Sequence, residues 1–289
     1  MPEYEIRAAR EGEFEAVRAL WKEGFGDSDD YIDAYRKLVY RPENTEVALA
    51  EGRIVSMVMV IPAELHLAGQ APLPAGYAYV LTTAQDHRGN GIGTRTIRSM
   101  AERKTAEGMA CIANSPDSDG LRALYARHGW QTAFYVRECN VAADALSAPV
   151  QAVPASAEEY HYLREAALRG TDHYSFGLSA VRLEEFVCHD GGGGLFRFPS
   201  RENCCAAAAY DERGRLQISE LLAPDRDILA CAAGVLSCLP AASAGIRLPV
   251  WSDAGLCAKA EPFAMLLPLG GIFQRLRDKP STYLGFDFC

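Results

Sequence analysis

Three glycines in the stretch Gln85–Thr94 (QDHRGNGIGT) have the types and spacing of a phosphate-binding loop. Gly89, Gly91 and Gly93 occupy every second position of the segment that joins a strand-like run to a helical run. Glycine lets the backbone turn sharply and come close to a ligand because it has no Cβ. The first amides of the following helix lack intrahelical partners and carry the positive end of its dipole, and Arg88 adds a cation. The loop is therefore predicted to bind a pyrophosphate.

Spacing separates this loop from two common nucleotide-binding motifs. A Rossmann fingerprint requires G-x-G-x-x-G, but the third position counted from Gly91 is Thr96. A Walker loop requires Gly-Lys-Ser/Thr, a combination that the sequence lacks. The remaining pattern is R-x-x-G-x-G, formed by Arg88, Gly91 and Gly93. The alternative is a glycine-rich strand-to-helix turn that binds no ligand.

The strand that leads into the loop is predicted over residues 76–83, and the helix that follows it over residues 94–107. Successive side chains of a strand point to opposite faces of the sheet. One face is expected to carry Tyr77, Tyr79 and Leu81, and the other Ala78, Val80 and Thr82.

The first half of the chain alternates strand-like and helical patterns and is predicted to be one α/β domain. Strands are expected at 4–9, 45–50, 54–67, 76–83, 109–113 and 131–141, and helices at 11–25, after Ser28, at 94–107 and at 121–128. Ser28 and Ser118 are predicted to cap the second and fourth of these helices. The stretch 142–157 is rich in small residues and proline and has no periodicity, so it is predicted to be a linker. Two domains are therefore expected, at 1–148 and 149–289.

A second motif lies downstream of the loop, in Leu124-Tyr125-Ala126-Arg127-His128-Gly129-Trp130. It resembles the Leu-Tyr-x-x-x-Gly-Phe element of the GNAT (GCN5-related) N-acetyltransferases, and the glycine loop resembles motif A of the same family. The interval from Arg88 to Tyr125 fits the family too. One departure is Ser118, where many members have asparagine. The resemblance covers roughly the first half and implies a GNAT fold, with a mixed, mostly antiparallel sheet flanked by helices, and acetyl-CoA as co-substrate.

The resemblance implies where acetyl-CoA binds. The pyrophosphate is expected on the loop, and the pantetheine arm along the preceding strand. The residues expected to bind acetyl-CoA are Leu81, Thr82, Arg88, Gly89, Asn90, Gly91, Ile92, Gly93 and Thr94. No metal ligands are expected.

Tyr125 is assigned as the group that protonates the leaving thiolate. A phenol with a pKa near 10 is only about 1.5 units weaker as an acid than a thiol near 8.5, a mismatch of roughly 2 kcal/mol. The alternative is that Tyr125 is a core aromatic between Leu121 and His128. The base that deprotonates the amine is left open, with weak candidates at His87, His128, Tyr79, Glu46, Glu138 and the carboxylate of Cys289.

The second half repeats the order hairpin, strand, helix, strand. Helices are expected at 158–168, 179–187 and 225–239, and strands at 195–199, 204–210, 216–222, 246–251, 263–267 and 282–288. Residues 220–224 enter their helix without a glycine loop. The half is therefore similar to a degenerate GNAT repeat, as in tandem GNAT proteins and the first two domains of the enhanced-intracellular-survival aminoglycoside acetyltransferases.

Bulk properties narrow the function classes. A net charge of −9 argues against nucleic-acid binding and suits a cationic amine partner. No apolar run reaches the roughly 18 residues of a membrane span, so no membrane partner and a cytoplasmic location are expected. Nine cysteines are read as reduced thiols. Exposed strand edges in both halves permit a homo-oligomer.

The expected reaction is transfer of an acetyl group from acetyl-CoA to a primary amine of a small molecule, such as an aminoglycoside or a polyamine, by direct attack in a ternary complex. The alternatives are a non-catalytic CoA-binding regulator or scaffold, and an acyltransferase with a different acyl donor.

Overall fold

The structure is a computed structural model that describes residues 3–252, 254–255, 259–269 and 282–288. The chain divides into two compact units. The first contains the described residues within Met1–Glu64, Leu73–Gln131 and Met265–Arg275, and the second contains those within Leu65–Pro72, Thr132–Ala264 and Leu276–Cys289.

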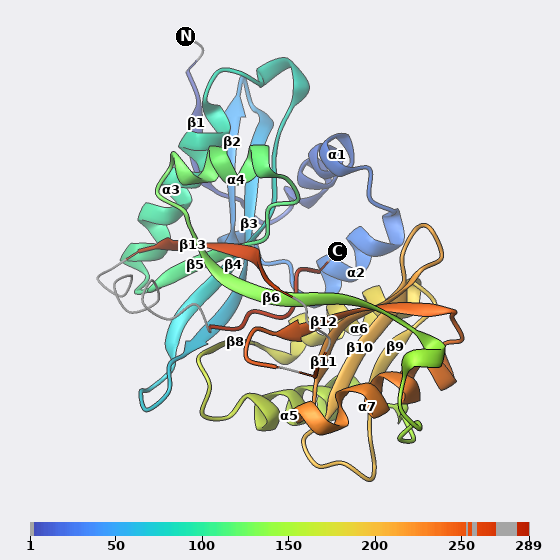
Figure 1. Cartoon of the computed structure of the whole chain (residues 1–289). Helices are drawn as coiled ribbons and strands as arrows, with labels where there is room; N and C mark the ends of the chain where they lie inside the picture. Colours follow the sequence, from blue (N-terminus) through green and yellow to red (C-terminus); the bar gives the residue numbers. More distant parts are fainter. Residues whose placement is uncertain (1–2, 253, 256–258, 270–281, 289) are drawn as a thin grey trace. The chain divides into compact units, whose positions relative to one another are not determined.

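A mixed sheet forms the centre of the first unit (Figure 1). Its strands, in spatial order, are β1 (Glu5–Ala8), β2 (Thr45–Ala50), β3 (Arg53–His66), β4 (Leu73–Thr83), β5 (Cys111–Asn114) and β13 (Ala260–Pro268). β1, β2 and β3 are antiparallel, whereas β4 and β5 are parallel. From Met265 onward, β13 pairs antiparallel with the other edge of β5. Glu51 and Gly52 both have positive φ, 50° and 80°, as a type I′ hairpin between β2 and β3 requires.

Helices cover both faces of this sheet. They are α1 (Phe14–Phe25), α2 (Asp29–Leu38), α3 (Ile92–Ala106) and α4 (Asp119–Ala126). Tyr79 of β4 lies against Trp21 of α1 and Tyr35 of α2, with ring centroids 6.1 and 5.6 Å away. Its neighbour Ala78 packs instead on a cluster that includes Met100 of α3 and Tyr125 of α4. Because adjacent strand residues face opposite ways, α1 and α2 cover one face and α3 and α4 the other.

Two helix starts follow from serine caps. The Ser28 hydroxyl accepts the Tyr31 amide at 3.1 Å, and the Ser118 hydroxyl accepts the Leu121 amide at 3.3 Å. Such caps satisfy amides that the first helical turn leaves without partners. The prediction of both caps is confirmed.

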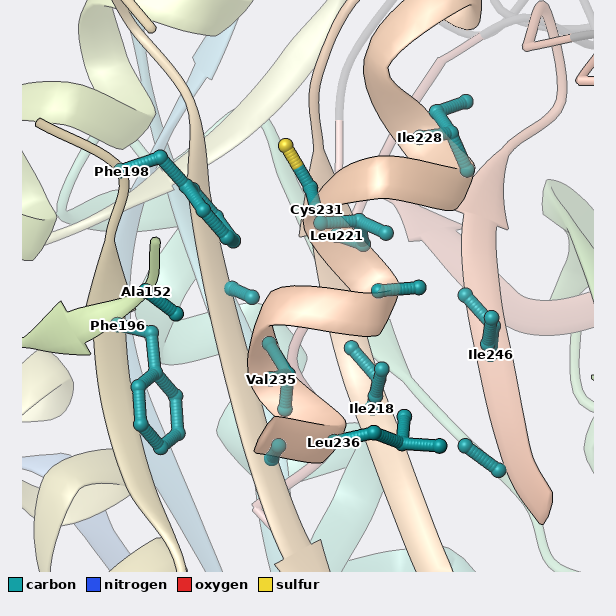
Figure 2. Close-up of a cluster of buried hydrophobic side chains, with 14 of the residues drawn as sticks. Ala152, Phe196, Phe198, Ile218, Leu221, Ile228, Cys231, Val235, Leu236 and Ile246 are labelled. Carbon is teal, nitrogen blue, oxygen red and sulfur yellow. The ribbon is translucent and has the colours of Figure 1, made fainter. Parts of the chain in front are cut away.

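The second unit contains further strands and helices. In spatial order its strands are β6 (Gln131–Ala142), β12 (Ser243–Pro249), β11 (Leu216–Leu222), β10 (Cys205–Tyr210), β9 (Gly194–Arg197) and β7 (Val153–Pro154), and its other elements include β8 (His173–Phe176), α5 (Ala157–Leu168), α6 (Leu178–Asp190) and α7 (Asp225–Cys238). β11 and β12 are parallel and joined through α7. Figure 2 shows Ile228, Val235 and Leu236 of α7 directed toward Ile218 of β11 and Ile246 of β12. This apolar layer forms the core of the second unit.

The order of the predicted elements of the second half is confirmed, apart from two differences. Residues 282–288 do not form a strand, and only Tyr283 makes an isolated bridge, to His173. The short strands β7 and β8 were not predicted. In the first half, α3 begins at Ile92 and not at Thr94.

The compact units divide the chain elsewhere than at residue 148. β6 pairs with β12 in the register Val136↔Pro249 to Ala142↔Ser243, so residues 132–148 belong with the second unit. The segment 65–72 belongs there too, and the Ala68 amide donates to Asp172 Oδ1 at 2.7 Å. Local composition identified a linker, but it carries no information on a pairing between strands a hundred residues apart. The second unit as a degenerate GNAT repeat stays a prediction.

Within the described part of the chain, no helix is both long and apolar enough to cross a membrane.

Candidate active site

The glycine loop joins the end of β4 to the start of α3. Gly89 and Gly91 have φ of 79° and 70°, a conformation that strains any residue with a side chain. A Cβ at either position would meet no described atom within 4 Å, so the backbone there is open to a ligand. Gly93 differs, because it is helical and its Cβ would lie 3.1 Å from Thr83 Oγ1. Gly93 therefore serves the packing of α3 on the end of β4.

The first turn of α3 presents amides toward this open side. Gly91 caps the helix, and the first intrahelical bond runs from the Arg95 amide to the Gly91 carbonyl at 3.1 Å. The amides of Ile92, Gly93 and Thr94 precede that bond, so they belong to the turn that has no intrahelical acceptors. With the helix dipole behind them, these groups suit a bound phosphate.

Arg88 closes the loop onto the strand that precedes it. Its Nε donates to the Thr83 carbonyl at 2.9 Å, and no carboxylate in the described ranges pairs with this exposed guanidinium. The Gln85 amide donates to Glu23 Oε1 of α1 at 2.7 Å, which fixes the start of the loop. Asn90 Nδ2 reaches the His87 carbonyl at 3.4 Å. The loop is thus anchored at both ends while its glycine centre stays exposed.

β4 contains an irregularity that sequence reasoning missed. Val80 has φ of 48°, which is a rare conformation for a β-branched residue. Leu81 packs on the Tyr125 cluster together with Ala78, whereas strict alternation places these two residues on opposite faces. The predicted faces are therefore wrong beyond Tyr79, because Val80 shifts the phase of the strand.

Near Val80 the main chain of β4 is no longer paired with β5 but is still hydrogen-bonded to β3. Pairing with β5 runs from Ala75↔Cys111 to Tyr77↔Ala113, while the Ala84 amide still donates to Val55 of β3 at 2.8 Å. Groups two residues apart in a strand point to the same side, so the Thr82 main chain faces β3, and its carbonyl accepts the Ser56 hydroxyl at 3.1 Å. The Leu81 groups then point away from β3. The geometry favours Leu81 over Thr82 as a main-chain contact for a ligand.

Thr82 has a packing partner on α1. A Cβ at Gly24 would lie 2.3 Å from Thr82 Oγ1, so only glycine allows this approach of α1 to β4. The sequence pattern gave no signal for this pair.

Tyr125 lies in a buried cluster on the α3/α4 face. Its side chain is 8% exposed, and its ring centroid is 5.4 Å from that of Trp130. Burial raises the pKa of Tyr125 to about 12, with a smaller opposing effect from the Asn114 side chain. The phenol therefore carries its proton throughout the physiological pH range.

Two polar atoms beside Tyr125 are buried without a hydrogen-bond partner among the described residues. They are Asn114 Oδ1, on the last residue of β5, and Trp130 Nε1. Buried polar groups are normally satisfied, so unsatisfied ones commonly mark a functional site. Ser118, the residue that departs from the family pattern, is occupied in capping α4.

His128 contacts the loop from the end of α4. Its Nε2 lies 3.3 Å from Thr94 Oγ1, in the first turn of α3. The sequence offered His128 only as a weak candidate for the base, because no spacing rule relates it to Thr94. The structure brings it to the predicted phosphate-binding turn.

Several candidates for the base are already engaged. Glu46 is 1% exposed and accepts from Ser99 Oγ at 2.6 Å and Arg103 Nε at 2.9 Å, so it fastens α3 to β2. Glu138 pairs with Arg247 in the second unit. His87 Nδ1 lies 3.1 Å from the Tyr4 hydroxyl. The Tyr79 hydroxyl contacts that of Tyr31, on the face opposite Tyr125, and Cys289 lies outside the described residues.

Comparison with known proteins places the chain in a family. Residues 5–133 match the model of an acetyltransferase (GNAT) domain. An acetyltransferase of Pectobacterium atrosepticum is 31% identical over 135 residues, which cover 44% of this chain and 88% of the relative. The chain therefore belongs to the GNAT acetyltransferase family, whose members use acetyl-CoA.

Solved structures agree on the fold. Eis1 from Mycobacterium abscessus superposes with a TM-score of 0.71 at 12% identity, over 92% of this chain and 74% of that chain. A GCN5-related N-acetyltransferase from Anabaena variabilis gives 0.73 at 12% identity, over 93% and 73%. A GCN5-related N-acetyltransferase from Kribbella flavida gives 0.68 at 15% identity, over 92% and 71%. The predicted family resemblance and the mixed α/β fold class are confirmed.

Proposed function

We propose that this protein transfers an acetyl group from acetyl-CoA to a primary amine of a small molecule, by direct attack in a ternary complex. One observation carries the proposal. The Val80 irregularity places Leu81 on the same face of β4 as Tyr125, whose phenol lies beside an unsatisfied buried acceptor on Asn114. A turn that merely connects a strand to a helix requires neither feature.

The residues fit acetyl-CoA in three respects. The backbone at Gly89 and Gly91 is open, the first amides of α3 have no intrahelical acceptors, and Arg88 is exposed beside them. When bound, acetyl-CoA supplies the activated acetyl group. The amides of residues 92–94 hold the pyrophosphate and Arg88 adds charge. The Leu81 main chain orients the pantetheine arm.

Tyr125 Oη is assigned to deliver a proton to the leaving sulfur. Against a thiol near 8.5, a phenol pKa of about 12 makes this transfer unfavourable by about 5 kcal/mol if the thiol keeps its value in water. A sulfur in the same buried surroundings has its own pKa raised for the same reason, so the mismatch shrinks. The high pKa also ensures that the proton is present before each turnover.

The acceptor is proposed to approach the face that α1 and α2 cover. Tyr31 and Tyr79, both partly exposed, lie there with their hydroxyls in contact, and the buried ring of Trp21 packs against both. Aromatic faces attract ammonium groups, and a net charge of −9 favours cationic molecules in general. Both features support an amine as the acceptor.

The test is release of free thiol from acetyl-CoA in the presence of a panel of aminoglycosides, polyamines and simple primary amines. Amine-dependent release, with a product heavier by one acetyl group, is the expected result. Binding of CoA in a calorimeter without turnover on any amine would favour the regulator or scaffold. Turnover with other acyl thioesters alone would favour a different donor, and absence of CoA binding would overturn the proposal.

A further inference from the structure

Three potential metal ligands converge within the second unit, whereas the glycine loop belongs to the first. They are His66, at the end of β3, Glu165 of α5 and His173 of β8. One ligand atom from each lies within 4.8 Å of the other two. The three residues are far apart or irregularly spaced in the sequence, so no metal-binding motif predicts this cluster.

The hydrogen bonding of His173 determines which of its nitrogens faces the cluster. Nδ1 lies 3.0 Å from the Thr171 carbonyl, which can only accept, so Nδ1 carries the proton. In a neutral ring Nε2 then holds a lone pair, and it lies 3.5 Å from Glu165 Oε2. Either a proton on Nε2 or a metal ion between the two atoms satisfies this contact.

The other groups are held in place by independent contacts. Arg164 Nη1 lies 3.4 Å from Glu165 Oε1, which leaves Oε2 as the oxygen directed to His173. The charge of Arg164 is matched by Glu220, whose Oε2 accepts its Nε at 3.0 Å. Glu165 Oε2 therefore faces His173, and the Ser175 side chain also hydrogen-bonds to this carboxylate.

His66 completes the group by stacking on His173. The two ring centroids are 4.8 Å apart and the ring planes differ by 22°. The bond from the Ala68 amide to Asp172 Oδ1, at 2.7 Å, holds the segment after His66 beside the residue before His173. The stacking and this bond bring the two imidazoles to one place, where a ring nitrogen of each lies within 4.8 Å of the Glu165 carboxylate.

We propose that His66, Glu165 and His173 bind one divalent transition-metal ion, with Zn²⁺ as the best match. Two imidazoles and one carboxylate are a ligand set that Zn²⁺ accepts, with bonds of about 2.0–2.2 Å and a fourth position for water. Tetrahedral bonds of this length put ligand atoms roughly 3.4 Å apart. The separation of 3.5 Å between His173 Nε2 and Glu165 Oε2 already matches that edge. The remaining ligand atoms, within 4.8 Å, need to close by at most about 1.4 Å to reach the same spacing.

The Nδ1 bond of His173 to the Thr171 carbonyl fits the same site. A metal-binding histidine usually donates its second ring N–H to a carbonyl or carboxylate, which fixes the ring and its tautomer. An ion here would join β3, α5 and β8 and so stabilise the second unit. The prediction of no metal ligands weighed only the cysteines.

The test is titration of the full-length, chelator-treated protein with Zn²⁺ in a calorimeter, with Co²⁺ absorption as a second readout. Saturable binding of one ion at this site is expected, together with a rise in melting temperature. His66→Ala, Glu165→Gln and His173→Ala should each weaken binding by more than about 100-fold, since even loss of a supporting partner costs about 10–100-fold. His189→Ala, which removes an exposed histidine of α6, should change neither quantity.

His66→Ala is the decisive variant, because His66 is only partly buried and its loss should leave the metal-free melting temperature nearly unchanged. Equal Zn²⁺ affinity in His66→Ala and the parent protein would overturn the site. Strong thiolate charge-transfer absorption with Co²⁺ that survives all three variants would assign the ion to cysteines and overturn it as well. Absence of saturable binding to the parent protein would do the same.

Discussion

Tyr125→Phe removes one buried hydroxyl and leaves the ring that packs at 5.4 Å from Trp130. Because the side chain is 8% exposed and sits in an apolar cluster, the variant should fold normally. Loss of one buried hydrogen-bonding group changes the free energy of unfolding by about 1 kcal/mol. Tyr125 lies on α4, outside the glycine loop that is proposed to bind the pyrophosphate. The dissociation constant for CoA should therefore stay within about threefold of the parent value.

The effect on turnover should be much larger. General acid catalysis contributes about 10²–10⁴-fold to a rate, so kcat should fall at least about tenfold and nearer a hundredfold if protonation of the sulfur limits the reaction. Product release can hide such a change in steady-state data, and single-turnover mixing with acetyl-CoA and amine avoids that problem. Tyr162→Phe is the matched control, since it removes the hydroxyl of a tyrosine that is 70% exposed on α5.

The pH profile adds an independent readout. With its pKa raised to about 12, Tyr125 stays protonated through pH 10, so the parent enzyme should show no loss of kcat from this group below that pH. The raised value means that the folded state favours the neutral phenol. The associated stability is therefore present below about pH 10 and lost as the pH rises toward 12. Unchanged single-turnover rates in Tyr125→Phe would refute the assigned role.

Three further predictions concern separate parts of the structure. Gly91→Ala should weaken CoA binding about 5- to 30-fold in calorimetry, because restoring the bound φ of 70° costs an alanine about 1–2 kcal/mol. The control Gly52→Ala, with φ of 80° in the β2–β3 turn, should lower the stability of the protein without changing its affinity for CoA. Gly24→Ala should lower the free energy of urea unfolding by about 1–3 kcal/mol, because its Cβ would lie 2.3 Å from Thr82 Oγ1, and Thr82→Ala should relieve part of that loss; additive effects would contradict the contact. Burial raises the pKa of Glu184 to about 8, so the folded state binds an extra proton between about pH 4.5 and 8 and the protein loses stability as the pH rises through that window. Glu184→Gln should remove this pH-dependent decrease in the free energy of unfolding, which amounts to at most about 4 kcal/mol at pH 7. Identical unfolding curves of the two proteins at pH 5 and at pH 8 would show that the carboxyl does not titrate as proposed.

Most of the fold was predictable because its signals are local. Apolar periodicity gave the order of helices and strands, and serine caps gave the starts of α2 and α4. Residues 282–288 misled because aromatic residues in alternation predict a strand. In the structure these residues pack their rings into the core without forming a strand. The ring centroid of Phe286 lies 5.8 Å from that of Phe176 and 6.1 Å from that of Tyr160.

The candidate site divides along the same line. The glycine loop and Tyr125 could be named because their spacing is fixed within a few residues. His128 could not be connected to Thr94, nor Gly24 to Thr82, because those approaches depend on how α4 and α1 pack on the sheet. Glu46 appeared free in the sequence and is buried under Arg103 for the same reason.

Val80 is the residue where local and tertiary preferences conflict. Valine favours an extended strand, and every sequence rule therefore continues β4 in regular alternation through Thr83. The observed φ of 48° costs a β-branched residue of order 1–3 kcal/mol, so the surrounding packing must enforce it. Three neighbouring contacts supply this constraint: Thr82 packs against Gly24, Leu81 packs beside Tyr125, and the Ala84 amide donates to the Val55 carbonyl. A fold that needed only a strand at this position would have no reason to retain that cost, whereas the proposed site, which uses the Leu81 main chain turned away from β3, does.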